Sequence, residues 1–266
     1  MRLGPKSTSF LAVLAISQPC VAQSPTRPDD ARRAYQVVLL GNTGAGTMEQ
    51  LEPTLRFARR RLMEAGENSA VVFLGDLLPC CGMPDSGTAG RAVAEERLMM
   101  LVDAVRDYPG RVLFIPGERD WGRNRREGWE SLLRMEDFIE VTLDRGNIFV
   151  PDEGLPGPHE VELADDIRLV ALNTQWLLTD NERSTGEAED YEAEEDADFY
   201  VALEDLIAKR STEDVIVVGH HPIYSHGRYG GHYPPKAHLF PLTLAWDAAW
   251  TPVLAPLALP LFLSGE

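Results

Sequence analysis

Four short segments of this chain place a glycine beside side chains that can bind a metal ion. The segments are Gly41-Asn42-Thr43-Gly44, Gly75-Asp76, Gly117-Glu118-Arg119-Asp120 and Gly219-His220-His221-Pro222. Carboxylate, amide and imidazole groups can coordinate metals, and a glycine lets the backbone turn sharply and come close to a bound ion. Any one of these aspartates or histidines, taken alone, is better explained as an ordinary turn residue. Together the four segments predict a metal cluster.

Each of the four segments follows a short apolar run of the kind that forms a buried strand. The runs span residues 35–40, 69–74, 111–115 and 215–218. Between the first three, apolar residues recur at helical spacing, at Leu51, Leu55, Ala58 and Leu62 and again at Leu98, Leu101, Val102 and Val105. Alternating strands and helices predict a parallel or mixed sheet, and functional residues gather beyond the carboxyl ends of such strands.

The second half of the chain adds antiparallel pairing. Residues 160–163 and 167–172 flank a polar turn and predict a hairpin. A helix is predicted before the strand at Val215 by the spacing of Phe199, Leu203, Leu206 and Ile207. The acidic stretch 186–198 lacks the glycine-centred spacing of an EF-hand calcium loop, so it predicts a solvated loop.

The chain is long enough for one sizeable α/β domain or, less comfortably, for two small ones, and we start from one domain. The chain has 266 residues, of which 44% are hydrophobic, enough for one sizeable core. Its formal net charge of −17 argues against nucleic-acid backbones and anionic membranes as partners, because both repel an acidic surface.

The first 22 residues are expected to be a secretory signal peptide. Arg2 and Lys6 precede an apolar run, 10–16, and small residues surround Ala22. Residues 23–34 are expected to be a linker, which leaves 35–266 as the folded domain and an exported protein, periplasmic or extracellular. A mildly hydrophobic N-terminus is the alternative, and the run is too short for a transmembrane anchor.

The cysteines predict no disulfide framework. Cys20 lies within the expected signal peptide, where its surroundings do not favour a lipid anchor. Cys80 and Cys81 are neighbours in the chain, and disulfide geometry strains the peptide between adjacent cysteines. We therefore expect both to remain unbridged.

The order and spacing of the four segments resemble the calcineurin-like metallophosphoesterases, especially the branch akin to purple acid phosphatases. Loops in that family read GDxG, GDxxY, GNH followed by an acid, a GHxP-like segment and finally GHxH. The resemblance runs from about residue 35 to the end, and includes Gly82-Met83-Pro84 and Leu172-Asn173-Thr174-Gln175-Trp176. It implies a four-layer αββα sandwich of mixed sheets flanked by helices.

The resemblance also implies the chemistry of the site. Two metal ions about 3.5–4 Å apart, of Fe, Mn or Zn, would bind a phosphorylated small molecule and activate a bridging water. Asp76 would bridge both metals and His220 would bind the second. Asn42 and Glu118 would complete the metal set, while Arg119, Asp120 and His221 would serve catalysis.

Several positions depart from the family pattern. Asn42 replaces an aspartate, Glu118 replaces an asparagine, and Arg119 replaces the histidine that holds the phosphate and assists the leaving group. An arginine does not release its proton at ordinary pH, so general-acid help worth about 10²–10⁴-fold is lost. Asp120 matches the family acid and could pair with Arg119, and Pro79 lies where some relatives have a tyrosine.

The chain ends at Leu263-Ser264-Gly265-Glu266 without the GHxH loop, so we expect a domain that is incomplete at its C-terminus. His226, His232 and His238 could replace the missing ligands, although their spacing gives no sign of it. Three readings follow: an impaired metal-dependent hydrolase of phosphate esters, a non-catalytic phosphate-binding protein on the same fold, or a fragment that lacks strands after Pro241 and is unstable alone.

Overall fold

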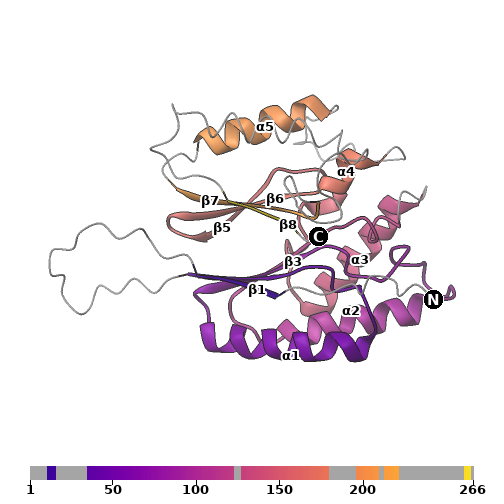
Figure 1. Ribbon diagram of the computed structural model, residues 1–266. Helices are drawn as coiled ribbons and strands as arrows, with labels where there is room; N and C mark the ends of the chain where they lie inside the picture. Colours follow the sequence, from indigo (N-terminus) through magenta and orange to yellow (C-terminus); the bar gives the residue numbers. More distant parts are fainter. Residues whose placement is uncertain are drawn as a thin grey trace, which may run out of the picture.

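The computed structural model describes residues 11–15, 35–122, 127–179, 196–209, 213–221 and 261–264. Two four-stranded sheets face each other, with the strand orders β1-β2-β3-β4 and β5-β6-β7-β8. Helices α1, α2 and α3 cover the outer face of the first sheet, and α4 and α5 lie on the outer side of the second (Figure 1). The predicted four-layer sandwich of mixed sheets is confirmed.

The first sheet consists of β1 (Leu11–Ala15), β2 (Gln36–Leu40), β3 (Ser69–Leu74) and β4 (Arg111–Ile115). Strands β2, β3 and β4 run parallel, and their last residues are in register, with Leu40 beside Phe73 and Leu74 beside Ile115. The glycine segments that follow these strands therefore begin at one edge of the sheet, as the sequence predicts.

Three helices cover this sheet: α1 (Met48–Ala65), α2 (Arg91–Val105) and α3 (Gly128–Leu143). Helix α1 begins at Thr47, whose hydroxyl accepts from the Gln50 amide while the Gln50 side chain accepts from the Thr47 amide, a capping box. The predicted helices correspond to α1 and α2. Helix α3 was not predicted.

The second sheet consists of β5 (His159–Ala164), β6 (Ile167–Leu172), β7 (Asp214–Gly219) and β8 (Leu261–Ser264). Strand β5 is antiparallel to β6, which confirms the predicted hairpin, and β6, β7 and β8 are parallel. This half of the domain also contains three helical elements: the short η1 (Asp152–Gly154) and α4 (Thr174–Leu178), and the longer α5 (Asp196–Lys209). Strand β8 lies in the tail that the sequence left without a strand.

The two faces of each strand have different partners because successive side chains point to opposite sides of a sheet. Alternate residues of both sheets meet in the inner core, among them Val37, Val72, Leu113, Leu169 and Ile216. The intervening residues face the helices. Strands β2, β3, β4, β6 and β7 contain almost only apolar residues because both of their faces are covered, which is why they could be recognised as apolar runs.

Strand β1 comes from the apolar run that we expect to be the core of a signal peptide. It pairs antiparallel with β2, from Leu11 beside Leu40 to Ala15 beside Gln36. Cleavage of residues 1–22 stays a prediction. Among the described residues, no helix is both long and apolar enough to cross a membrane.

The expectation for the two adjacent cysteines was wrong: Cys80 and Cys81 form a disulfide. Cys81 adopts a left-handed backbone conformation, with φ of 69°, and Gly82 follows with φ of 66°. This sharp turn, which the sequence alone does not reveal, brings neighbouring side chains to the same side.

Candidate functional site

Three of the four glycine segments meet at the carboxyl ends of β3, β4 and β7, and their glycines allow the approach. A Cβ atom on Gly117 would lie 2.8 Å from Asp76 Oδ1 and 2.9 Å from His220 Cε1. A Cβ atom on Gly75 would lie 2.8 Å from His220 Nδ1. Real Cβ atoms do not come this close to other heavy atoms, so only glycine permits this arrangement.

Asp76 lies at the centre of this arrangement. Its backbone is left-handed, with φ of 54°, and its side chain is only 4% exposed. Oδ1 accepts a hydrogen bond from the backbone N–H of Arg119 at 2.8 Å. The Asp76 carbonyl accepts from Gly44 N at 2.6 Å, so the loop after β2 packs directly against this residue.

His220 is fully buried, and its orientation is fixed by the backbone. Nδ1 lies 2.8 Å from the carbonyl oxygen of Leu74, which can only accept, so Nδ1 carries the proton and donates. The other ring nitrogen, Nε2, lies 3.5 Å from Asp76 Oδ1. An imidazole nitrogen and a carboxylate oxygen facing each other are both potential metal ligands, and a backbone carbonyl behind the ring is typical of metal-binding histidines.

Arg119 supplies the positive charge closest to Asp76 among the described residues. Its guanidinium Nε lies 3.0 Å from Asp76 Oδ2, and the arginine side chain is 22% exposed. The sequence placed Arg119 where a phosphate would be held. In the structure its guanidinium lies on the candidate metal-bridging carboxylate.

Asp120 holds the backbone of the site together. It is fully buried; Oδ1 accepts from the amides of Leu77 at 2.9 Å and Leu78 at 3.3 Å, and Oδ2 accepts from Gly117 N at 2.9 Å. Burial, with the charge of Asp76 next, raises the pKa of Asp120 to about 7, against the opposing effect of these hydrogen bonds. The ion pair with Arg119 that the sequence left open does not form, because that guanidinium faces Asp76.

Asn42 presents a polar atom without a partner. Its backbone is left-handed, with φ of 55°, and its carbonyl accepts from Ala45 N at 2.9 Å. The side-chain oxygen Oδ1 is buried and accepts no hydrogen bond within the part of the chain that the structure describes. A buried acceptor left unbonded costs roughly 1–3 kcal/mol, which a bound cation or water would recover.

The remaining predicted residues differ in how closely they join the site. The ring of His221 lies 4.9 Å from that of His220 at 85°, and its Nδ1 is 2.8 Å from Thr174 Oγ1. Glu118 is half-buried and forms no hydrogen bond or ion pair with other described residues. His226, His232 and His238 lie outside the described residues.

Asn173, which sequence reasoning gave no role, links the turns of the two sheets. Its Oδ1 accepts from Trp121 Nε1 and from Trp176 N, both at 3.2 Å, and its Nδ2 donates to the carbonyls of Gly154 and Leu155. The signal was present: Asn173 directly follows the apolar run of β6, as the other site residues follow their strands.

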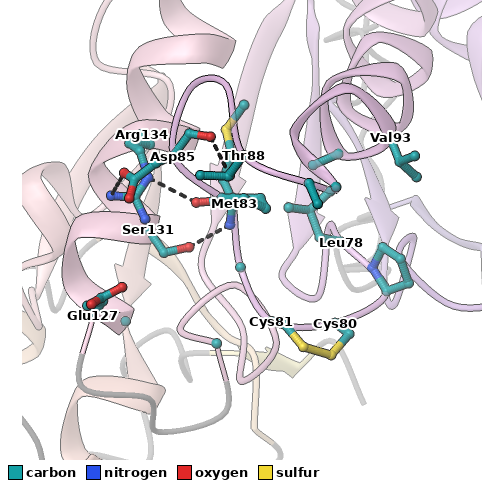
Figure 2. A pocket seen from close by; sticks show the side chains of 18 residues that line it. Leu78, Cys80, Cys81, Met83, Asp85, Thr88, Val93, Glu127, Ser131 and Arg134 are labelled. Atoms are coloured by element: carbon teal, nitrogen blue, oxygen red, sulfur yellow. Dashed lines mark hydrogen bonds and ion pairs between the residues drawn. A yellow bond between two sulfur atoms is a disulfide. The ribbon is translucent and has the colours of Figure 1, made fainter.

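The loop that carries the disulfide lines a cavity of about 770 Å³ next to the turn at Arg119. Gly82 N donates to the Arg119 carbonyl at 2.8 Å, which ties this loop to the site. Figure 2 shows Arg134 reaching the carbonyl of Met83 and the carboxylate of Asp85, with Cys80 and Cys81 at the other end of the loop. These contacts hold the loop against α3.

Comparison with known proteins agrees with this geometry. The sequence profile of the calcineurin-like phosphoesterase family matches residues 37–247, which is well over half of the chain. No curated protein matches the sequence. The narrower likeness to the purple-acid-phosphatase branch stays a prediction. With this match, and with the strand-end turns meeting at Asp76 and His220, the chain belongs to the calcineurin-like phosphoesterase family.

Proposed function

We propose that this protein is a metal-dependent hydrolase of phosphate esters whose rate is limited by the altered residues of its site. The observation that carries the proposal is the pairing of Asp76 Oδ1 with Nε2 of His220, 3.5 Å apart and buried. The family generally binds two metal ions and acts on phosphate esters, so this pair is the natural place for such an ion.

The side chains present fit one cation better than two. Asp76 and His220 face each other, and the orphaned Oδ1 of Asn42 belongs to the loop that packs on Asp76. Among the described residues, no group of three or more His, Cys, Asp or Glu side chains could hold an ion. We assign a metal to Asp76, His220 and Asn42 on the contacts of these three residues, with an amide oxygen as its weakest ligand.

A bound divalent metal supplies Lewis acidity and lowers the pKa of a coordinated water. The protein contributes binding and orientation. Arg119, once off Asp76, can hold two phosphoryl oxygens through its planar guanidinium. Asp120 fixes the turn that carries Arg119, and Thr174 orients the His221 ring. Since Arg119 provides no acid, esters with good leaving groups, such as aryl phosphates, are the preferred substrates.

A second candidate function is phosphate binding without turnover. It is favoured by the Arg119–Asp76 ion pair, which neutralises the site without any metal, and by the loss of the acid at position 119. Both candidates predict an anion at the same place. They differ in whether the bound ester is cleaved.

The deciding experiment measures metal content and hydrolysis of p-nitrophenyl phosphate on the purified full chain and on Asp76→Asn. Asp85→Asn is the matched control, because Asp85 also pairs with an arginine but is well exposed. We expect bound metal and turnover in the parent and the control, and neither in Asp76→Asn. A well-folded parent that stays metal-free and inactive would rule out the hydrolase, and phosphate-dependent thermal stabilisation without turnover would establish the second function.

We also propose that the protein is exported to the periplasm or the cell exterior, on the composition of its first 22 residues. The test is N-terminal sequencing of the protein recovered from a secreting host. A mature N-terminus at Gln23 supports export with cleavage after Ala22, whereas an intact Met1 in the cytoplasmic fraction contradicts it.

A further inference from the structure

We propose that the guanidinium of Arg119 stands in for a cation against Asp76, so that a metal ion binds only by displacing it. This inference rests on the proposed metal site and adds a property specific to this chain. Without metal, the guanidinium of Arg119 is the cation that pairs with Asp76. Metal binding therefore exchanges one cation for another.

The first argument is the position of the charge. Arg119 Nε lies 3.0 Å from Oδ2 of Asp76, and the carboxylate side chain is 4% exposed. The other carboxylate oxygen, Oδ1, accepts the backbone N–H of the same arginine at 2.8 Å and faces His220 Nε2 at 3.5 Å. A metal that used both oxygens would have to occupy the space that the guanidinium now takes at Oδ2.

The second argument is the cost of an uncompensated charge. A buried carboxylate is strongly unfavourable unless it is paired with a cation or protonated. A cation beside Asp76 is therefore required in every state in which that carboxylate stays ionised.

The third argument is that Arg119 is built to move at its side chain alone. Its backbone is fixed, because its N–H donates to Asp76 and its carbonyl accepts from Gly82 at 2.8 Å and Gly122 at 3.0 Å. Its side chain is 22% exposed, so the guanidinium can reach solvent without opening the core. Displacing the guanidinium therefore breaks its ion pair with Asp76 but leaves the backbone turn at Arg119 intact.

The test is isothermal titration of the full chain with Mn²⁺, without substrate, comparing the parent with Arg119→Ala and Arg119→Lys. We expect Arg119→Ala to bind Mn²⁺ at least tenfold more tightly, since nothing competes for Asp76. Arg119→Lys keeps a cation but loses the planar guanidinium, so we expect an intermediate affinity. Arg134→Ala is the control, because the Arg134 side chain is about as buried as that of Arg119 but pairs with the exposed Asp85, so its loss should leave the Mn²⁺ affinity unchanged.

The melting temperature, measured with and without Mn²⁺, is a second test of the proposal. Arg119→Ala should melt at a lower temperature than the parent without metal, and the gap should close in saturating Mn²⁺. A purely structural role for Arg119 predicts the opposite for affinity, because a loosened site binds metal less tightly. If Arg119→Ala fails to fold, Arg119→Lys still decides, since its affinity must exceed that of the parent.

The outcomes separate the two proposals. Mn²⁺ binding by the parent that is equal to or tighter than that of both variants overturns the exchange and leaves the metal site standing. Absence of Mn²⁺ binding in the parent and in every variant overturns both, because there is then no ion for Arg119 to exclude. Binding by Arg119→Ala that disappears in the double variant with Asp76→Asn supports both.

Discussion

Two buried acids of this domain are neutralised in opposite ways. Asp76 is paired with the Arg119 guanidinium. Glu136, on α3, is 8% exposed; its burial, and then its contact with Asp152, raise its pKa to about 9. A carboxyl group with that pKa is protonated and uncharged at neutral pH. The acid after β3 therefore has a cation as its partner, while the acid on α3 takes up a proton.

The backbone explains the difference. Asp76 follows Gly75 in a left-handed conformation, at a turn where three chain segments meet. Such conformations cost roughly 1–3 kcal/mol and persist where the surroundings impose them, most often at functional sites. Glu136 lies in regular helix and accepts a hydrogen bond from Glu153 N at 3.3 Å. Of the two acids, Asp76, with its left-handed backbone, is the one that is paired with a cation.

The largest expected effect comes from changing each acid to its amide. Asp76→Asn should reduce metal binding and p-nitrophenyl phosphate hydrolysis by on the order of 100-fold or more, because the central ligand loses its charge. Glu136→Gln should leave both within about twofold of the parent, since Glu136 is already uncharged at pH 7. Metal titrations and measurements of the hydrolysis rate on both variants check this prediction. Equal losses of binding and rate in the two variants would show that Asp76 and Glu136 do not differ in this way.

The next effect tests the close approach that holds Asp76 against His220. Gly117→Ala should lower the free energy of unfolding by about 2–3 kcal/mol, because the added Cβ would lie 2.8 Å from Asp76 Oδ1 and 2.9 Å from His220 Cε1. Gly146→Ala is the control, since a Cβ there meets nothing within 4 Å. Urea denaturation measures both variants. A Gly117→Ala protein as stable as the control would mean that the turns are not in contact.

The third effect concerns how Glu136 responds to pH. Its folded-state pKa of about 9 lies above the ordinary value of 4.5, so folding takes up a proton between these two values. The stabilising effect is complete below pH 4.5 and is lost as the pH rises toward 9. Glu136→Gln should thus come close to the parent near pH 5 and exceed it at pH 8 by on the order of 4 kcal/mol.

Urea denaturation across this pH range checks the prediction. Asp137→Asn, at the exposed neighbouring position, should leave the slope of the parent unchanged. A parent whose stability rises between pH 5 and pH 8 more than that of Glu136→Gln would show that Glu136 is ionised after all.

Much of the fold could be predicted because β2, β3, β4, β6 and β7 are buried on both faces. Each of these five strands therefore stands out as an apolar run, and parallel register brings the residues after it to one edge. Helix α3 was missed although Leu132, Met135 and Ile139 follow helical spacing. Strand β8 offered no comparable signal, since three apolar residues and a serine at the end of an apolar tail have no distinguishing period.

The sequence predicted several residues whose side chains the structure brings together, but not how they pair. The sequence identified Asp76, His220 and Arg119, because each follows a strand and a glycine. It placed Asp120 beside Arg119 as a possible partner, but neighbouring side chains on a turn point in different directions, and the guanidinium reaches Asp76 instead. Such pairing depends on how separate strands are brought together, which no local spacing encodes.

The smallest effect concerns the disulfide loop that joins the site to its cavity. Replacing Cys80 and Cys81 together by serine should change the free energy of unfolding by less than about 1 kcal/mol, because a bridge between adjacent residues closes almost no loop. The same change should speed amide hydrogen exchange across residues 77–83, and it should weaken Mn²⁺ binding only slightly, since Gly82 contacts the backbone of Arg119 and leaves Asp76 untouched. If the double serine variant lost as much Mn²⁺ binding as Asp76→Asn, the disulfide loop would be part of the metal site. The segment to compare with Glu136 would then be the whole loop together with Asp76.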